Sequence, residues 1–245
     1  MTRRAAGVLG GMGPAATIDL MSKVLLHSQR ARGTGSREQT DVRLIVDSNP
    51  AVPDRNAAVA GTGPSPAPML VAMARGLSAA GADFLVMPCN AAHAFAGAVR
   101  QATSIPFVSI IDETAAALAA DYPGVDRVGI LAVEGCADAR LYERVLEPAG
   151  IEVVSPGPAL RRQFMETIWA VKAGDRSAAS AASLRDVAGA LQAQGASVIL
   201  AACTEVPLLL GTGDLDVPLV DTTDVLARST VAYALGKPLP ALQAS

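Results

Sequence analysis

Short apolar runs alternate with alanine-rich stretches of helical character along the whole chain. In the first half the pattern predicts strands at about residues 5 to 10, 42 to 49, 83 to 89 and 106 to 110, and helices at about 14 to 29 and 66 to 80. The apolar runs are continuous, as is typical of parallel strands that are covered on both faces. Strands that alternate with helices indicate βαβ units, so the pattern predicts an α/β fold.

The second half of the chain repeats the order of the first. The segment "GASVILAACTEVP" matches "GADFLVMPCNAAH", and "VPLVDTTDVLA" matches "IPFVSIIDETA". In both halves a cysteine follows a glycine by eight positions and an aspartate follows a proline by six: Gly81 and Cys89, Gly195 and Cys203, Pro106 and Asp112, Pro218 and Asp224. We therefore predict two similar doubly wound parallel-sheet lobes related by a pseudo-twofold axis. The alternative, that any two βαβ units look alike, explains the strands but not the matched cysteines.

Composition narrows the class of partner. The chain has 245 residues, a formal net charge of -3, 51% hydrophobic residues and 3% aromatic residues. No apolar run approaches the roughly 18 residues of a membrane span, and the N-terminus has no long apolar segment of a signal peptide, so we expect a cytoplasmic protein without a membrane partner. Since there is no basic stripe, we expect a small-molecule substrate and no nucleic acid.

Three cysteines are the main candidates for chemistry. They form no CxxC pair, so the sequence predicts neither a metal site nor a disulfide framework. Cys89 and Cys203 each follow an apolar strand, at the carboxyl end where open α/β sheets bind ligands. A helix that starts after each thiol would favour the thiolate and lower its pKa. The alternative is that they are small buried apolar residues, which is what we expect of Cys136 because it has no counterpart in the first half.

Two thiols that face each other across one substrate suit the inversion of a stereocentre. One thiolate removes the α-proton of an amino acid, and the other thiol delivers a proton to the opposite face. Without a pyridoxal Schiff base the carbanion is poorly stabilised, so donors around the α-carboxylate are needed. Backbone N–H groups at loops and at helix N-termini can supply them.

The glycine loop "GVLGGMGPAAT" has the G-x-G-x-x-A spacing of a dinucleotide-binding turn. The next strand, however, ends with Asp47, 36 positions after Gly11 (47 - 11), whereas the acid that binds a ribose is expected about 20 positions on. We therefore expect the backbone around Met12 and Gly13 to border the site and to face a substrate carboxylate.

Five segments carry a resemblance to a known family: "GVLGGMGP", "NPAVPDR", "GADFLVMPCNAAHAF", "WAVKAG" and "ACTEVPLLL". In their order and spacing they resemble the aspartate/glutamate racemase superfamily, specifically its cofactor-independent aspartate racemases, from about residue 5 to residue 235. The resemblance implies an active site in the cleft between two lobes, Cys89 and Cys203 as the two bases, no cofactor, and a homodimer. It also implies an N-terminal lobe of residues 1–111 plus 224–245, with the last helix returning to it, and a second lobe of residues 112–223.

The resemblance also assigns substrate-binding residues. It implies that Arg55 and Lys172 hold the distal carboxylate, that Asn90 and Thr204 bind the amino and α-carboxylate groups, and that Glu205 holds the ammonium or tunes Cys203. The predicted substrate-binding set is Met12, Gly13, Asn49, Arg55, Asn90, Ala91, Lys172, Thr204 and Glu205. Lys172 also suits a helix C-terminus with Gly174 as its cap. For His93, one helical turn after Cys89, a packed or solvated role is favoured over contact with the thiolate.

The chain departs from the family pattern at two places. Ala91 stands where the family has a threonine, and "VEGCADA" stands where small hydroxyl residues are usual, which leaves open whether aspartate or another acidic amino acid is the substrate. Three other functions remain open. They are a dicarboxylate isomerase or decarboxylase with a cysteine nucleophile, a pyridoxal phosphate enzyme with Lys172 as Schiff base, and a binding or sensor protein whose paired thiols form a redox switch.

Overall fold

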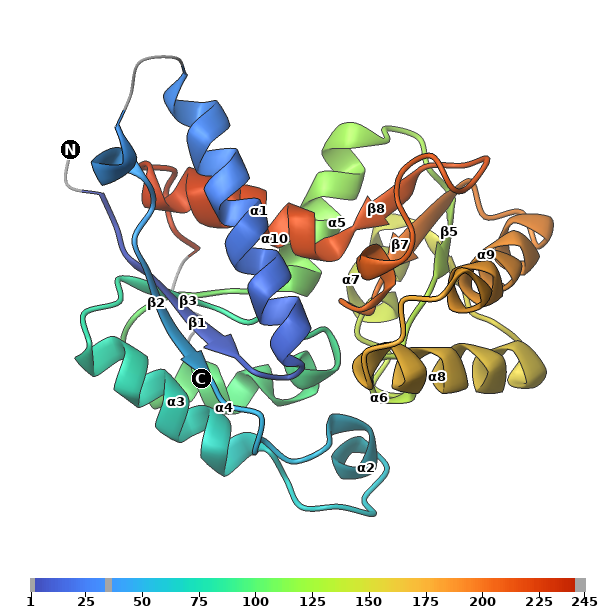
Figure 1. Ribbon diagram of the computed structural model, residues 1–245, viewed down its shortest axis with the longest axis horizontal. Coiled ribbons are helices and arrows are strands. Elements are labelled where there is room, and N and C mark those ends of the chain that lie inside the picture. The colour runs from blue at the N-terminus through green and yellow to red at the C-terminus, as the bar shows by residue number, and fades with distance from the viewer. Residues whose placement is uncertain (1–2, 34–36, 241–245) are drawn as a thin grey trace.

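Two parallel four-stranded sheets form the cores of two lobes in the computed structural model of the chain (Figure 1). The structure describes residues 3–33 and 37–240. The first sheet has the order β2-β1-β3-β4 and the second the order β6-β5-β7-β8, so the predicted α/β fold with two similar lobes is confirmed. The strands are β1 (Ala6–Gly10), β2 (Leu44–Ser48), β3 (Phe84–Val86), β4 (Phe107–Val108), β5 (Arg127–Ile130), β6 (Glu152–Val154), β7 (Val198–Ala201) and β8 (Leu219–Asp221).

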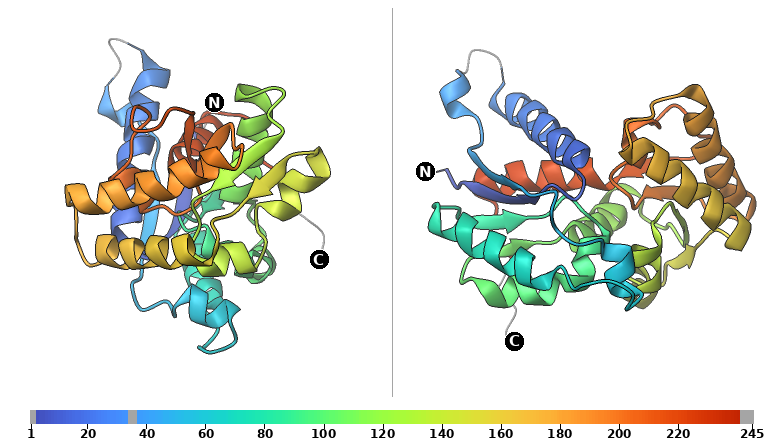
Figure 2. Two further views of the ribbon diagram at one scale, coloured as in Figure 1. Left: turned by 90° about the vertical axis from the view of Figure 1, so that its right-hand side faces the viewer. Right: turned by 60° about the horizontal axis from the view of Figure 1, so that its bottom comes forward.

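Helices cover both faces of the sheets (Figure 2). They are α1 (Pro14–Arg32), α2 (Arg55–Val59), α3 (Ala67–Ala79), α4 (Ala96–Ala102), α5 (Ile110–Asp121), α6 (Glu134–Asp138), α7 (Glu143–Leu146), α8 (Pro158–Lys172), α9 (Ala178–Ala193) and α10 (Thr222–Ala234). Short 3-10 helices are η1 (Glu38–Thr40), η2 (Ala91–Phe95), η3 (Glu147–Ala149) and η4 (Val206–Leu208). The strand predicted at 106 to 110 ends at Val108 because the Ser109 side chain accepts a hydrogen bond from the Asp112 N–H and starts α5.

Each sheet has a topological switch point at its first strand. β1 pairs with β2 on one side and with β3 on the other, and β5 lies in the same way between β6 and β7. The connection after β1 leads to β2 and the connection after β3 leads to β4 in the opposite direction, so a crevice opens between the carboxyl ends of β1 and β3, and in the same way between those of β5 and β7. The loops after β1, β3, β5 and β7 therefore converge on the region between the lobes.

A pair of matching glycines shows how closely the two lobes repeat each other. A Cβ built at Gly7 would lie 2.8 Å from Leu85 Cδ2 and 2.9 Å from Ala82 Cβ. A Cβ at Gly129 would lie 2.7 Å from Ile199 Cδ1 and 3.1 Å from Ala196 Cβ, which are the corresponding atoms of the second lobe. In each lobe the first strand therefore has room only for a glycine where the third strand and the preceding helix pack against it.

We expect alanine at either glycine to destabilise the protein. Gly7→Ala and Gly129→Ala should each lower the free energy of unfolding by about 1–3 kcal/mol, because the added methyl group displaces buried neighbours. Gly76→Ala in α3 is the matched control, since a Cβ there meets nothing within 4 Å and should raise stability by up to about 1 kcal/mol. Urea unfolding measures the three variants. Equal midpoints for Gly7→Ala and Gly76→Ala would contradict the close packing.

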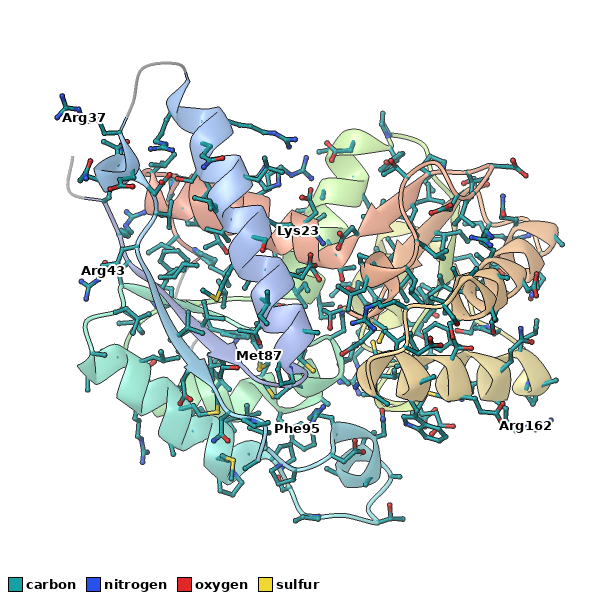
Figure 3. All side chains as sticks on the ribbon, in the orientation of Figure 1. Lys23, Arg37, Arg43, Met87, Phe95 and Arg162 are labelled. Carbon is teal, nitrogen blue, oxygen red and sulfur yellow. The ribbon has the colours of Figure 1, made fainter. Side chains whose placement is uncertain are left out.

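The last helix of the chain packs against the first part of it. α10 lies between α1 and α5, and the ring of Tyr233 meets that of Phe84 in β3 edge to face, with 6.3 Å between centroids. Lys23 on α1 donates to Asp19 on its own helix and to Asp221 at the start of α10 (Figure 3). The proposed lobe boundaries at 111/112 and 223/224 fall inside α5 and α10, and residues 1–2 and 241–245 lie outside the described residues.

None of the helices described in residues 3–33 and 37–240 combines the length and apolar character that crossing a membrane requires.

Candidate active site

A pocket with about 300 Å³ of free space, part of it open to solvent, lies where the two lobes meet. The loops after β1, β3 and β7 border it, together with the start of α2 and the end of α8. Its lining residues are Met12, Arg55, Asn56, Cys89, Asn90, Ala91, Val133, Lys172, Ala202, Cys203, Thr204 and Glu205. Nine of these are in the predicted catalytic and substrate-binding set, so the structure brings most of that set together.

Both cysteines of the matching motifs line this one pocket. Cys89 lies three residues after the end of β3 and Cys203 two residues after the end of β7, at corresponding edges of the two sheets. Cys89 is 6% exposed and Cys203 4% exposed, and neither forms a disulfide. Each lobe therefore contributes one shielded thiol to the same small space.

Glu205 makes the surroundings of the two thiols different. The Cys203 thiol donates a hydrogen bond to Glu205 Oε2, with 3.1 Å between sulfur and oxygen, and Thr204 Oγ1 donates to the same oxygen at 3.4 Å. The corresponding position beside Cys89 is Ala91, which has no carboxylate. The Cys203 thiol thus has a built-in proton acceptor, because a carboxylate accepts only.

The pKa of Cys203 lies well above its ordinary value. Burial raises it most, the charge of Glu205 raises it further, and Lys172 lowers it. The prediction that a following helix lowers the thiol pKa is therefore wrong for Cys203. The segment that follows Cys203 is the single 3-10 turn η4, which is too short to build a sizeable helix dipole, and desolvation of the thiol outweighs it.

Two cations converge on the pocket from the two lobes. Lys172, the last residue of α8, lies 3.9 Å from Glu205 Oε1. Burial acts to lower the pKa of Lys172, but the negative charge of Glu205, and of Cys203 and Cys89 in their thiolate forms, outweighs it, so the pKa is raised and the ammonium stays charged. The guanidinium of Arg55 donates to the carbonyls of Val52, Pro53 and Met12 at 3.0–3.4 Å. Its buried Nε–H has no acceptor among the described residues.

Asn90 is held by two side chains from the second half of the chain. Its Oδ1 accepts a hydrogen bond from the Tyr142 hydroxyl at 2.6 Å, and its Nδ2 donates to Thr222 Oγ1 at 3.2 Å. The Thr222 hydroxyl in turn donates to the Ala201 carbonyl at the end of β7. One N–H of the amide remains for a ligand beside Cys89, and the network fixes its position.

A sequence profile of the Asp/Glu/hydantoin racemase family matches residues 9–230. The chain belongs to this family. It is 26% identical over 230 residues to the broad specificity amino-acid racemase RacX of Bacillus subtilis (strain 168). The aligned region covers 94% of this chain and 97% of RacX. The relatives of this chain are thus amino-acid racemases, which are isomerases.

Solved structures of this racemase family have the same fold. The aspartate racemase of Picrophilus torridus superposes with a TM-score of 0.84 at 26% identity, over 97% of this chain and 96% of that one. The glutamate racemase of Francisella tularensis subsp. tularensis SCHU S4, solved in complex with D-glutamate, superposes with a TM-score of 0.65 at 16% identity, over 96% and 81% of the two chains. The latter similarity shows the fold alone.

Two residues of the predicted set lie outside the pocket lining. Gly13 lies next to it, since a Cβ there would be 3.3 Å from Glu205 Oε1. Asn49 packs against the glycine loop, since a Cβ built at Gly11 would lie only 2.3 Å from the Asn49 backbone nitrogen. The φ of +90° at Gly11 also suits glycine. The Asn49 side chain accepts a hydrogen bond from the Ala51 N–H, so it stabilises the turn after β2.

Three residues that line the pocket were not predicted from the sequence: Asn56, Val133 and Ala202. Val133 lies in the loop after β5, which matches the glycine loop after β1, so the internal repeat was a signal that could have identified it. Ala202 directly precedes Cys203. No sequence motif pointed to Asn56, because its role depends on how the two lobes dock.

Cys136 lies outside the pocket lining. It is 1% exposed in α6, and burial, followed by the charges of Glu143 and Cys89, raises its pKa. This is the buried thiol that we predicted at this position. Within residues 3–33 and 37–240, no group of three or more His, Cys, Asp or Glu side chains is placed to hold a metal ion.

His93 is part of the scaffold behind Cys89. Its Nε2 accepts a hydrogen bond from the Ile110 N–H at 3.2 Å, and the geometry assigns the Nδ1–H as donor to the Cys89 carbonyl at 2.9 Å. The ring packs on Phe107. Burial lowers the pKa of His93 to about 4, so the imidazole is neutral. The ring is packed in the scaffold, in agreement with the favoured prediction of a packed or solvated role.

His93 should make the stability of the protein fall in mild acid. The unfolded chain binds a proton to this ring below its ordinary pKa of 6.5, whereas the folded protein does so only near 4. The stabilisation is therefore fully present above pH 6.5 and is lost as the pH falls toward 4, by up to roughly 3 kcal/mol. Urea unfolding between pH 7 and pH 4.5 measures this loss. His93→Gln should flatten the profile, and an unchanged slope in that variant would contradict the assignment.

Proposed function

We propose that this protein racemises an acidic amino acid without a cofactor, with aspartate as the preferred substrate and glutamate or a related amino acid as alternatives. The observation that supports this best is the pair of cysteines from corresponding positions of the two lobes in one pocket, together with two cations. Deprotonation on one face and protonation on the other require two such groups.

In the proposed reaction, the cysteine that begins as thiolate takes the α-proton and becomes a thiol. The other cysteine gives its proton to the opposite face of the α-carbon and becomes a thiolate. The reverse direction exchanges the two roles. Glu205 Oε2, 3.1 Å from the Cys203 sulfur, can take the proton of that thiol before Cys203 acts as the base. Since the pKa of Cys203 is raised, its thiolate is a strong base once formed.

The carbanion develops its negative charge on the α-carboxylate. The remaining N–H of Asn90 and backbone N–H groups of the loop around Met12 are the donors proposed to stabilise it, joined by the Thr204 hydroxyl once it turns away from Glu205 Oε2. Asn90 is fixed by Tyr142 and Thr222, so this donor needs no reorganisation during the reaction. Arg55 and Lys172 are proposed to hold the distal carboxylate, which orients the α-carbon between the two sulfurs.

The substrate is best identified by a screen of enantiomer pairs. L- and D-aspartate, L- and D-glutamate and related acidic amino acids are incubated with the protein, and the loss of circular dichroism is followed. We expect the fastest loss with aspartate. Absence of any loss with all acidic amino acids would contradict the proposed function.

The other functions make different predictions. A dicarboxylate isomerase should act on a diacid without an amino group such as maleate, which Arg55 and Lys172 could hold equally well, so maleate is included in the screen. A pyridoxal phosphate enzyme requires a neutral lysine, whereas the pKa of Lys172 is raised. A sensor protein should bind its ligand unchanged in a Cys89→Ala variant and should have no turnover to lose.

We also propose a cytoplasmic homodimer. A reducing compartment suits three free cysteines.

On α1, Ile18, Met21 and Leu25 are 65%, 41% and 47% exposed and follow one another at helical spacing, as a stripe beside the edge strand β2. A second copy of the same stripe would bury them around a twofold axis. Light scattering should give twice the mass of 24.9 kDa, and Ile18→Asp with Leu25→Asp should give the monomer. A monomeric wild type would contradict the proposal.

A further inference from the structure

Helix α2 of the first lobe packs against helix α6 of the second lobe at the edge of the pocket (Figure 2). At this contact Asn56 Oδ1 accepts a hydrogen bond from the Gly135 backbone N–H, with a distance of 2.8 Å. Asn56 itself lines the pocket and directly follows Arg55 in the chain. The hydrogen bond therefore joins the two lobes next to the residue proposed to bind the distal carboxylate.

The surfaces fit each other closely at this point. A Cβ at Gly135 would lie 2.9 Å from Asn56 Oδ1, 3.1 Å from Asn56 Cα and 3.2 Å from the Arg55 carbonyl oxygen. Only a glycine lets α2 come this near. The N-cap residue of α6, Val133, provides no side-chain hydrogen bond, so the Gly135 N–H finds its acceptor on the other lobe.

Among the described residues, the guanidinium of Arg55 donates hydrogen bonds only to carbonyls of the first lobe, those of Val52, Pro53 and Met12. Lys172, with which it must share a carboxylate, belongs to the second lobe. The distance between the two cations therefore depends on how the lobes dock, and the Asn56–Gly135 hydrogen bond joins the lobes one residue away from Arg55.

We propose that Asn56 is a positioning residue for substrate binding, which holds Arg55 in register with Lys172 by docking α2 onto α6. The proposal rests on the proposed function in that it takes the ligand to have a distal carboxylate. Misplacement of a binding group by about 1 Å is enough to lose a large part of its contribution. Loss of Asn56 should thus weaken the use of Arg55 without touching either thiol.

A double-mutant cycle with L-aspartate tests this proposal. Asn56→Ala should lower kcat/KM about tenfold, mainly through a higher KM. In an Arg55→Ala background the same change should cost less than twofold, because there is no guanidinium left to position. Thr62→Ala is the matched control on the same segment, since it removes an exposed hydrogen bond to the Ala57 carbonyl within the first lobe, and should stay within twofold of wild type.

Equal losses from Asn56→Ala in both backgrounds, or no loss at all, would overturn the proposal. Two measurements separate it from the proposed function. Hydrogen exchange of the Gly135 amide should become faster in Asn56→Ala and not in Thr62→Ala, and unchanged exchange would refute the docking contact. The dissociation constant of L-aspartate, from calorimetry, should show the same cycle as kcat/KM. If the wild type binds aspartate but does not racemise it, the proposed function is refuted. The dissociation constants of the four proteins in the cycle would still test the role of Asn56.

Discussion

Cys89→Ser and Cys203→Ser are each expected to lose about a thousandfold in the rate of racemisation. A serine hydroxyl is a far weaker acid than a thiol, so it neither forms the base nor delivers a proton at a useful rate, and a positioned general acid or base contributes about 10²–10⁴-fold. The sulfur that remains still faces the α-proton of one enantiomer. Each variant should therefore exchange the α-proton of one enantiomer only, and the two variants should differ in which one.

Cys136→Ala provides the control for these two variants. Cys136 is buried in α6 outside the pocket lining, so the loss of its thiol should leave kcat within about threefold of wild type. Chiral chromatography measures racemisation, and NMR in D2O measures exchange of each enantiomer. If Cys89→Ser and Cys203→Ser racemise as fast as Cys136→Ala, the two thiols are not the acid and the base.

Arg55→Ala is expected to lower kcat/KM for aspartate about a hundredfold and Lys172→Met about tenfold. Arg55 can hold a carboxylate with two parallel hydrogen bonds, and a charge-assisted pair of this kind is among the strong polar contacts. Lys172 loses less because its side chain is 31% exposed and already faces Glu205. Arg55→Lys should recover only part of the activity, since an ammonium does not match the two carboxylate oxygens.

Two controls separate the distal contact from general damage. Arg162→Ala removes a cation from the same helix as Lys172, on a side chain that points away from the pocket (Figure 3), and should be neutral. Alanine as substrate lacks the distal carboxylate, so its slow α-proton exchange should be equal in wild type and in Arg55→Ala. An equal loss for alanine and aspartate would show that Arg55 does not bind that group.

The sequence was sufficient to predict the fold and the meeting of Cys89 and Cys203 in one pocket, because both follow from patterns along the chain. The strands are continuous apolar runs, and the internal repeat places Cys89 and Cys203 at the same edge of two sheets. The same repeat is visible in the structure, where Gly7 packs against Leu85 in the first lobe as Gly129 packs against Ile199 in the second.

Features that depend on contacts between distant segments could not be predicted in this way. The pKa of Cys203 is raised because the thiol is buried and lies against Glu205, whereas the sequence pattern predicts a helix where the chain forms only a 3-10 turn. Asn90 is held by Tyr142 and Thr222, which are 52 and 132 positions away. Asn56 acquires a role only when α2 meets α6.

The most direct test of the two-thiol account is one measurement with L-aspartate in D2O and no added cofactor. We expect the D-aspartate formed at early times to contain one solvent deuterium at its α-carbon and the remaining L-aspartate to contain almost none, because separate thiols remove and deliver the proton. D-aspartate that retains the original proton would contradict the account, since a single group would then have carried it from one face to the other.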